Sequence, residues 1–338
     1  MKTLPFTLLA SILLLPSMQA SPVKLIFDTD MGNDIDDAMA LVMIHALERR
    51  GACELLAVTS TKDHPKSAPF IDALDTYSCR PNIPVGAVRN GVTPEIGKYL
   101  GLIDQKDERG NLVYPHDLLS GTDAPEAVGL LRKTLAAAPD KSVTIAQVGF
   151  FTNLARLLES KPDANSPLDG VALIKQKVAQ IVIMAGSFQT IQFNTRHGEY
   201  NVVKDVPSAQ LLAEKWPTPV VWSGYEIGIA VLYPWDSMMK DYEHTKPHLI
   251  KEAYLAYVPK HPHERPTWDL TAAFYAIHPD RGYFDVSPPG HVHVDDKGHT
   301  DFTPSKDGND RYLLLSELQA TRVREAFVQL CSEPAPKK

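Results

Sequence analysis

Five aspartates fall between positions 28 and 37 of the chain, at positions 28, 30, 34, 36 and 37. Asp28 and Asp30 are two residues apart at the end of an apolar run, so their side chains are expected on one face of a strand end. Asp34, Asp36 and Asp37 fall at the start of a helical pattern, where one or two aspartates can serve as caps. Five carboxylates at one strand-to-helix turn repel one another strongly unless a cation neutralises them.

The composition of this cluster indicates which cation it would hold. Oxygen-only ligands suit Ca²⁺ or Mg²⁺ rather than Zn²⁺. The spacing does not match the EF-hand loop, which needs Gly at its sixth position and Glu at its twelfth. The phosphate-binding patterns GxGxxG and GxxxxGK[ST] are both absent from the sequence. The residues alone therefore predict a hard-cation site at this turn.

The elements that must position the cluster alternate along the chain. Strands are expected at 23–28, 54–60, 83–88, 142–149, 179–186 and 219–223, and helices at 34–50, 67–77, 124–138, 152–160, 207–215, 268–278 and 316–331. This alternation predicts a Rossmann-like α/β fold with a mostly parallel central sheet and helices on both faces. Ligands bind beyond the carboxyl ends of the strands in such sheets. The Pro- and Gly-rich parts at 84–121 and 283–308 are expected to be excursions from one domain.

Composition and the first residues set the protein class. The 338 residues are 44% hydrophobic and 22% charged, typical of a globular chain, and the net charge of −7 disfavours a nucleic-acid partner. Met1–Ala20 has a basic start and an apolar run too short to span a bilayer, which predicts a signal peptide cleaved after Ala20. The expectation is an exported, periplasmic or secreted protein whose residues 21–338 form one domain without membrane contact. The alternative is an uncleaved tether.

The three cysteines are Cys53, Cys79 and Cys331, and none forms a CxxC pair. Zinc and iron–sulfur sites therefore have no support. Export to an oxidising compartment would permit one disulfide, and the sequence leaves its presence open.

The run from Asp28 to Ala38 resembles the signature DxDxGxDDA of the inosine–uridine-preferring nucleoside hydrolase family, with a middle two residues longer. Four later segments resemble family motifs in the same order: residues 148–155, 183–186, 198–205 and 268–269. The resemblance covers about residues 23–280. It implies a nucleoside substrate, an active site at the carboxyl ends of the strands, and a homodimer or homotetramer.

The resemblance also implies a single Ca²⁺ per site. Asp30 would bind this ion and act as general base on a metal-bound water. Asp37, Asp269 and the main-chain carbonyl of Val148 would be the further ligands.

The same resemblance implies a set of substrate-binding residues. Asp36, Glu199 and Asn201 would contact the ribose, and Met184 lies in the strand that lines the substrate. Asn194 is a looser candidate, because the loop before Glu199 is one residue out of register with the family.

Three acids have no assured role in the family pattern. Asp28 is expected to orient the turn at the end of the first strand. Asp34 lies in the two-residue insertion and has no counterpart. Asp63 falls in a region that often contacts ribose, where the alignment is weak.

Trp268 departs from the pattern of many family members, which have His immediately before the late metal-binding Asp as a general acid. An indole N–H is only a hydrogen-bond donor. The change resembles the purine-preferring subgroup, in which a Trp stacks on the base, and therefore favours purine nucleosides. Candidates for a stacking partner are Phe188, Phe193, Trp222 and Tyr225. Three loop histidines offer alternative proton donors: His116, His261 and His263.

The function this predicts is Ca²⁺-dependent hydrolysis of the N-glycosidic bond of ribonucleosides to free base and ribose. Cleavage builds positive charge on the sugar, which a ring of carboxylates favours electrostatically. One alternative is a phosphatase of the haloacid-dehalogenase type with Asp28 as nucleophile and Asp30 as acid. The Asp36-Asp37 pair and the missing Lys and Ser/Thr motifs argue against it. A second alternative is an exported nucleoside- or sugar-binding protein without turnover.

Overall fold

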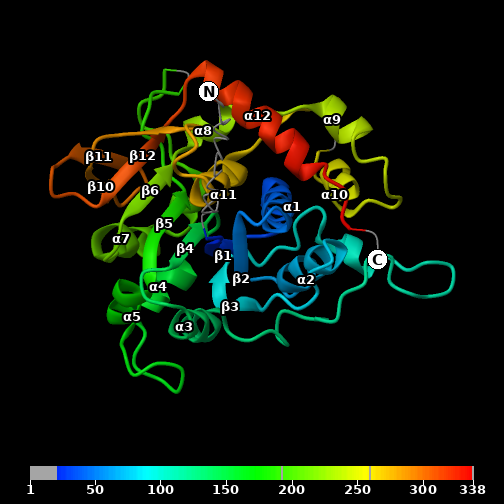
Figure 1. The fold of residues 1–338 in the computed structure, drawn as a ribbon, viewed down its shortest axis with the longest axis horizontal. Coiled ribbons are helices and arrows are strands. Elements are labelled where there is room, and N and C mark those ends of the chain that lie inside the picture. Colours follow the sequence, from blue (N-terminus) through cyan, green and yellow to red (C-terminus); the bar gives the residue numbers. More distant parts are fainter. Residues whose placement is uncertain (1–20, 192, 259, 337–338) are drawn as a thin grey trace, which may run out of the picture.

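The computed structural model describes residues 21–191, 193–258 and 260–336 of the chain. The predicted signal peptide, residues 1–20, lies outside the described residues. Within them, ten strands form one sheet in the order β11-β10-β12-β6-β5-β4-β1-β2-β3, with β9 paired to β12 (Figure 1). The sheet strands are β1 (Val23–Thr29), β2 (Cys53–Lys62), β3 (Val85–Val92), β4 (Val143–Gln147), β5 (Val178–Met184), β6 (Val220–Ser223), β9 (Asp285–Val286), β10 (Gly290–Val294), β11 (Thr300–Pro304) and β12 (Asp310–Leu314).

Seven strands, in the spatial order β3-β2-β1-β4-β5-β6-β12, pair in parallel. At one edge, β9 and β10 pair with β12 in antiparallel orientation, and β11 pairs with β10 in the same way. A short separate ribbon pairs β7 (Leu232–Tyr233) with β8 (Arg265–Pro266). The predicted α/β architecture with a mostly parallel sheet is therefore confirmed.

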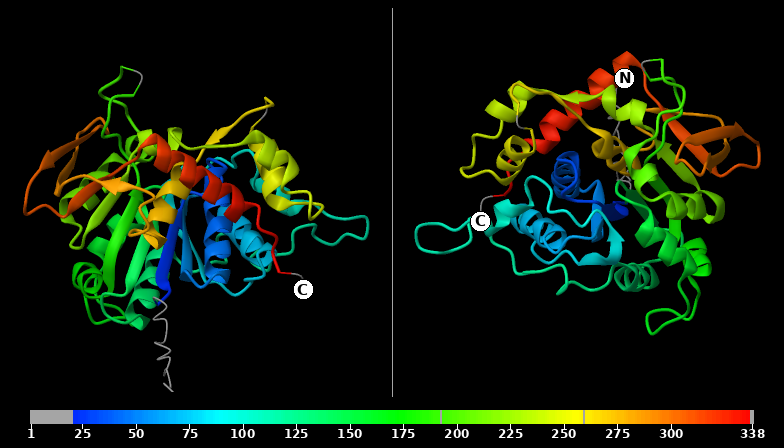
Figure 2. Two further views of the ribbon diagram at one scale, coloured as in Figure 1. Left: turned by 45° about the horizontal axis from the view of Figure 1, so that its top comes forward. Right: turned by 180° about the vertical axis from the view of Figure 1, so that it is seen from behind.

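Helices cover both faces of this sheet (Figures 1 and 2). Alternation along β1 explains why, since Leu25 and Phe27 pack into one hydrophobic cluster and Ile26 into the other. The helices on the Leu25 side are α1 (Asp36–Arg49), α2 (Ser67–Tyr77), α10 (Leu249–Tyr257), α11 (Trp268–Ile277) and α12 (Glu317–Cys331). Those on the Ile26 side are α3 (Ala127–Ala137), α4 (Thr152–Glu159), α5 (Gly170–Lys177) and α7 (Val206–Lys215). Shorter helices are η1 (Leu100–Asp104), α6 (Tyr200–Lys204), α8 (Tyr225–Ile229) and α9 (Trp235–Lys240).

Strand β1 lies between β2 and β4, at the point where the chain changes its direction of progress across the sheet. Such a switch point opens a crevice beyond the carboxyl ends of the two flanking strands. The chain leaves β1 at Thr29, so Asp30 and the following turn lie at that edge.

Two expectations about elements are corrected. The first helix begins at Asp36 rather than at residue 34, because the carbonyl of Asp34 accepts from the hydroxyl of Tyr99 at 2.5 Å and the first helical backbone bond runs from Met39 N–H to the carbonyl of Ile35. Residues 283–308 are not an excursion, since they supply β9, β10 and β11 to the central sheet. In Figure 2 the β10–β11 hairpin (orange) lies at the outer edge of the molecule.

All three cysteines are free thiols, with Cys53 and Cys331 buried. None of the helices in the described part of the chain is long and apolar enough to cross a membrane.

Candidate active site

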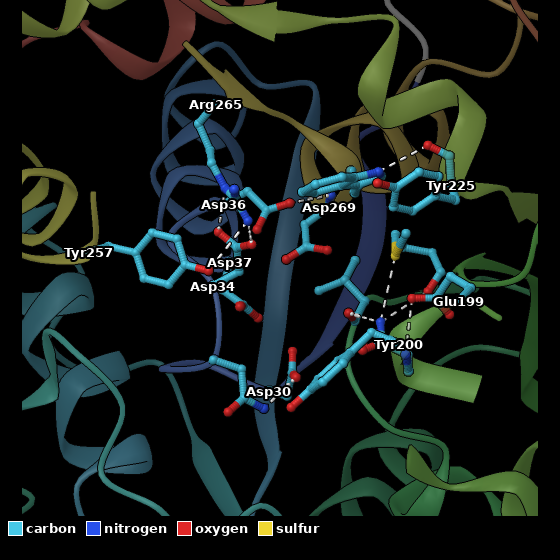
Figure 3. A pocket seen from close by; sticks show the side chains of 15 residues that line it. Asp30, Asp34, Asp36, Asp37, Glu199, Tyr200, Tyr225, Tyr257, Arg265 and Asp269 are labelled. Atoms are coloured by element: carbon cyan, nitrogen blue, oxygen red, sulfur yellow. Dashed lines mark hydrogen bonds and ion pairs between the residues drawn. The ribbon is translucent and has the colours of Figure 1, made fainter. Parts of the chain in front are cut away.

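A cavity of about 360 Å³ opens at the carboxyl edge of the sheet (Figure 3). The carboxylates contributed by the β1–α1 turn meet residues that follow β4, β5 and β6. The lining residues are Asp30, Asn33, Asp34, Asp36, Asp37, Val148, Met184, Glu199, Tyr200, Asn201, Tyr225, Tyr257, Arg265, Trp268 and Asp269. The first turn of α1 and the first turn of α11 therefore face one another across this crevice.

Asp36, Asp37 and Asp269 form the centre of the cavity wall. One carboxylate oxygen from each lies within 4.8 Å of the other two, and all three side chains are buried. The backbone N–H of Asp269 donates to Asp36 at 3.1 Å, which ties the start of α11 to the start of α1. This spacing is compatible with one cation shared among the three carboxylates.

The electrostatics of the cluster support the same conclusion. Burial, and then repulsion among the neighbouring carboxylates, raises the pKa of Asp37 and of Asp269 well above the ordinary value. Asp37 accepts a hydrogen bond from the hydroxyl of Thr29, while its other oxygen is buried without a partner among the described residues. A buried carboxylate oxygen of this kind is suited to a metal ion, so these residues fit a hard cation.

Asp30 lies beside the cluster and is held from the opposite side. Asn33 Nδ2 donates to its carboxylate at 2.7 Å, and the amide oxygen of Asn33 accepts from Lys62 Nζ at 2.6 Å. Burial raises the pKa of Asp30 to about 6, against the lowering effect of Asn33 and the Lys62 charge. Asn33 and Lys62 therefore hold this carboxylate in place at the cavity wall.

The turn after β4 passes unusually close to β1. A Cβ placed on Gly149 would lie 2.4 Å from the backbone nitrogen of Asp30, so no larger residue fits here without movement. The carbonyl of the preceding residue, Val148, lines the cavity and accepts from Asn201 Nδ2 at 2.9 Å. Val148 is therefore placed with the predicted ligand set.

Glu199 and Asn201 enter the cavity from the start of α6. Glu199 caps that helix, and its carboxylate accepts from the backbone N–H groups of Asn201 (2.9 Å), Val202 (3.2 Å) and Gly186 (3.2 Å). Burial raises the pKa of Glu199 to about 7. Asn201 Nδ2 also reaches the carbonyl of Met184 at 3.3 Å, so the predicted substrate residues Glu199, Asn201 and Met184 lie together.

Trp268 and Tyr225 form an aromatic wall on the same side. Their ring centroids are 5.3 Å apart, and the indole N–H donates to the carbonyl of Tyr225 at 2.9 Å. The other proposed stacking partners lie elsewhere. Phe193 is fully exposed, Trp222 is fully buried and bonded to Asp310, and Phe188 stacks on Tyr312, and none of these three lines the cavity.

Asp34, the acid without a family counterpart, is the partner of Arg265. Arg265 Nε donates to Asp34 Oδ1 at 3.0 Å, and Nη2 contacts the other carboxylate oxygen. The guanidinium also lies 5.2 Å from the Trp268 ring and 5.1 Å from the Tyr257 ring. In Figure 3, Arg265 and Asp30 lie on opposite sides of the central carboxylates.

Three candidate residues are not brought into the cavity. Asp28 is buried beneath it and accepts from Thr59 and from Asn153 Nδ2 at 2.9 Å, which also removes it as a phosphatase nucleophile. Asp63 is half-buried and accepts from the backbone of Gly91 at 3.1 Å. Asn194 is exposed and lines a neighbouring cavity, where its side chain caps the backbone of the next turn.

Sequence reasoning missed Asn33, Lys62, Tyr200, Tyr257 and Arg265. Asn33 lies inside the aspartate run, so its position was a usable signal. Arg265 precedes the Trp-Asp pair by only three residues, yet nothing local shows that it meets Asp34, 231 positions away.

The family and relatives of the chain agree with this geometry. The family model described as inosine-uridine preferring nucleoside hydrolase matches residues 25–324. RihA of Salmonella paratyphi B (strain ATCC BAA-1250 / SPB7) is 30% identical over 211 residues, and RihA of Escherichia coli (strain SMS-3-5 / SECEC) is 28% identical over 208. Both are named pyrimidine-specific ribonucleoside hydrolases. Each alignment spans 61% of this chain and 61% of the relative.

Solved structures share the fold. A plant nucleoside hydrolase superposes with a TM-score of 0.70 at 21% identity, covering 93% of this chain and 100% of that one. A purine-preferring ribonucleoside hydrolase from Gardnerella vaginalis gives 0.69 at 18% identity, covering 91% and 98%. The family match takes in both halves of the carboxylate cluster and nearly the whole described sheet. The chain therefore belongs to the inosine–uridine preferring nucleoside hydrolase family.

Proposed function

We propose that this protein hydrolyses the N-glycosidic bond of ribonucleosides in a Ca²⁺-dependent reaction that favours purine nucleosides. One observation carries the proposal: Asp30, Asp36, Asp37 and Asp269 converge in one cavity that Glu199 and Asn201 also enter, in a chain of this family. Export through residues 1–20 and assembly into a dimer or tetramer belong to the same proposal.

The cation would be held by the carboxylates of Asp37 and Asp269, which lie together beside Asp36. Asp30 and the carbonyl of Val148, which line the same cavity, would complete the ligand set. When bound, Ca²⁺ would supply positive charge that offsets the carboxylates, orients the ribose diol and makes a coordinated water more acidic.

The chain's own residues perform the remaining steps. Asp30, which lines the cavity beside the carboxylate cluster and is oriented by Asn33, accepts the proton of the attacking water. Asp36 and Asn201 have polar atoms at the cavity wall that can hold ribose hydroxyls, and Glu199 orients Asn201 through its backbone bond. The surrounding negative charge favours the oxocarbenium character that develops on the sugar.

The preference for purines rests on the aromatic wall. Trp268 and Tyr225 offer a large apolar surface to a planar base. Because the indole N–H is bound to the Tyr225 carbonyl, Trp268 contributes area and orientation rather than a proton.

The proposal is tested by measuring release of reducing sugar from inosine, guanosine, adenosine and uridine, with Ca²⁺ and after exhaustive chelation. We expect turnover with Ca²⁺, purine substrates ahead of uridine, and loss of activity with chelator. Absence of sugar release, combined with a rise in melting temperature on adding nucleoside, would instead identify a binding protein.

A further inference from the structure

Arg265 is the only positively charged side chain among the described residues that line the main cavity, and His is absent from that lining. The lining is otherwise carboxylates, amides, apolar groups and aromatic rings. The Arg265 guanidinium could serve only to neutralise one of these acids. Its hydrogen bonds show a more specific arrangement.

Two of the three nitrogens of Arg265 are engaged. Nε and Nη2 bind the two oxygens of Asp34, and Nη2 also reaches the hydroxyl of Tyr257 at 3.3 Å. Nη1 has no hydrogen-bond partner among the described residues. The side chain keeps 21% of its surface exposed although it belongs to a buried cluster. Its remaining donors are therefore available to a molecule in the cavity.

The position of Arg265 suits contact with the base of a nucleoside rather than with its sugar. In Figure 3, Asp30 and Glu199 lie away from Arg265, and among the acids assigned to the sugar only Asp36 lies beside it. Arg265 lies instead at the rim, against the rings of Trp268 and Tyr257. A planar base resting on the Trp268 wall would bring its edge towards the guanidinium.

We propose that Arg265, oriented by Asp34, binds the carbonyl oxygen of the leaving base and makes the site selective for nucleosides of oxo bases over those of amino bases. This inference rests on the proposed hydrolysis of ribonucleosides. Hypoxanthine, guanine and uracil present carbonyl oxygens, whereas adenine presents an amino group at the corresponding edge. A guanidinium only donates, so it matches the former and leaves the latter unpaired.

The same contact assists departure of the base. The C1′–N bond breaks and its electron pair remains on the base, while the water oxygen bonds to C1′ and its proton passes to Asp30. In an oxo base the negative charge spreads onto the carbonyl oxygen, where the N–H groups of Arg265 stabilise it. The base then takes a proton from solvent, and Asp30 releases its own. Arg265 thus stabilises the leaving base, which Trp268 cannot do because its single N–H already donates to the carbonyl of Tyr225.

The test compares inosine with adenosine, which differ at the base edge, and adds 4-nitrophenyl β-D-ribofuranoside, whose leaving group is a stable anion. In Arg265→Gln we expect kcat/KM for inosine to fall on the order of 100-fold. The kcat/KM of this variant should fall less than about tenfold for adenosine and less than about threefold for the nitrophenyl riboside, since cleavage of neither depends on a bond to a base carbonyl. Asp34→Asn should lower the ratio of kcat/KM for inosine to kcat/KM for adenosine by a smaller factor, because Asp34 acts only by positioning Arg265.

Lys98→Gln provides the matched control. Lys98 Nζ lies 4.6 Å from the centroid of the Tyr257 ring, and Lys98 does not line the main cavity, so this change removes a nearby positive charge without altering that lining. We expect it to leave the inosine-to-adenosine ratio unchanged. Circular dichroism and melting temperature establish that each variant is folded.

Equal losses on inosine and adenosine in Arg265→Gln, or a comparable loss on the nitrophenyl riboside, would overturn the inference while the proposed hydrolysis stands. A wild-type protein that cleaves no nucleoside would overturn the proposed function itself, and the inference with it. An unchanged ratio in Asp34→Asn would remove the positioning role of Asp34.

Discussion

At the scale of single residues, the five aspartates near the start of the chain divide into three environments. Four of them line the cavity, and among these Asp34 alone is paired with Arg265, whereas Asp30, Asp36 and Asp37 are not. Asp28 is enclosed beneath the site by Thr59 and Asn153. Burial raises the pKa of Asp28 to about 7, and its hydrogen bonds with Thr59 and Asn153 tie the end of β1 to β2 and α4. Identical side chains a few residues apart thus differ in function because their partners differ.

Asp30→Ala should abolish turnover, because in the proposed mechanism Asp30 is both a metal ligand and the base that accepts the proton of water. We expect kcat to fall by at least about 1,000-fold, measured as sugar release at saturating nucleoside. The variant should remain folded, since it relieves repulsion among buried carboxylates. Activity within tenfold of the parent would contradict the assignment.

Trp268→Ala should reduce kcat/KM for inosine more than for uridine, because a purine covers more of the aromatic wall. Loss of one stacking ring is worth about 0.5–1.5 kcal/mol beyond its buried area. Tyr225→Phe keeps the ring and serves as control. Equal losses on the two substrates would refute stacking as the source of preference.

The sequence was sufficient to predict these residues where the signal is local or carried by a family motif. The aspartate run, Glu199, Asn201 and Trp268 are of this kind. Lys62 and Arg265 were missed because their contacts join segments that are remote in the chain, and a lysine after a strand or an arginine before a proline has no distinctive local pattern.

At the scale of elements, the site depends on how closely the ends of β1 and β4 approach. The turn after β4 must pass against Asp30, and Gly149 permits this because it has no Cβ. The hydroxyl of Thr61 would lie equally close to a Cβ at this position, at 2.4 Å. The close approach of these two strand ends therefore depends on glycine at position 149.

Gly149→Ala should impair activity more than the small size of the added methyl group suggests. This methyl group must displace the backbone at Asp30 and not merely a flexible side chain. We expect a loss of about 1–3 kcal/mol in stability, measured by urea unfolding, together with a fall in kcat. Gly129→Ala in α3, where the nearest atom to a Cβ is 4.0 Å away, is the matched control. Wild-type kinetics in Gly149→Ala would contradict this account.

The start of α10 carries a pH-dependent element. Burial lowers the pKa of His248 to about 4, with smaller effects from His244 and Lys251, and its ring packs between Tyr77 and Tyr242. The unfolded chain takes up the proton near pH 6.5, so the stability that depends on neutral His248 is present above pH 6.5 and is lost as the pH falls towards 4.

His248→Phe keeps an aromatic ring and removes the titration. The free energy of unfolding of this variant, relative to wild type, should rise by about 2 kcal/mol between pH 7 and pH 5. Urea unfolding at a series of pH values measures the difference. Parallel curves for the two proteins would show that His248 does not titrate in this way.

Sequence reasoning predicted the βα units well, because their apolar periodicity is long and regular. It failed at residues 283–308, since β9 has two residues and β10 alternates inward Val292 and Val294 with exposed histidines. Frequent Pro and Gly in the same stretch gave the composition of a loop. Strands this short gain their stability from the neighbouring strand, which a local pattern does not reveal.

At the scale of the whole molecule, the carboxylate cluster costs folding energy until a cation offsets its charge. Ca²⁺ should therefore raise the melting temperature. A free Ca²⁺ concentration of one hundred times the Kd would stabilise the folded protein by about 2.7 kcal/mol. Calorimetry with Ca²⁺ and with chelator measures this effect, which Asp269→Asn should largely remove. The same melting temperature in both conditions for the wild type would contradict a cation site.

The bond between Asp36 and the backbone of Asp269 joins positions 233 residues apart. No N-terminal fragment that ends before α11 can contain the complete cluster, however well its strands have paired. Loop closure over such a length belongs to the late stages of folding, after the local βα units have formed. Calcium affinity would then report the order of assembly: partly folded chains would bind the ion weakly, and a tightly bound ion would mark the moment at which α11 docks against α1.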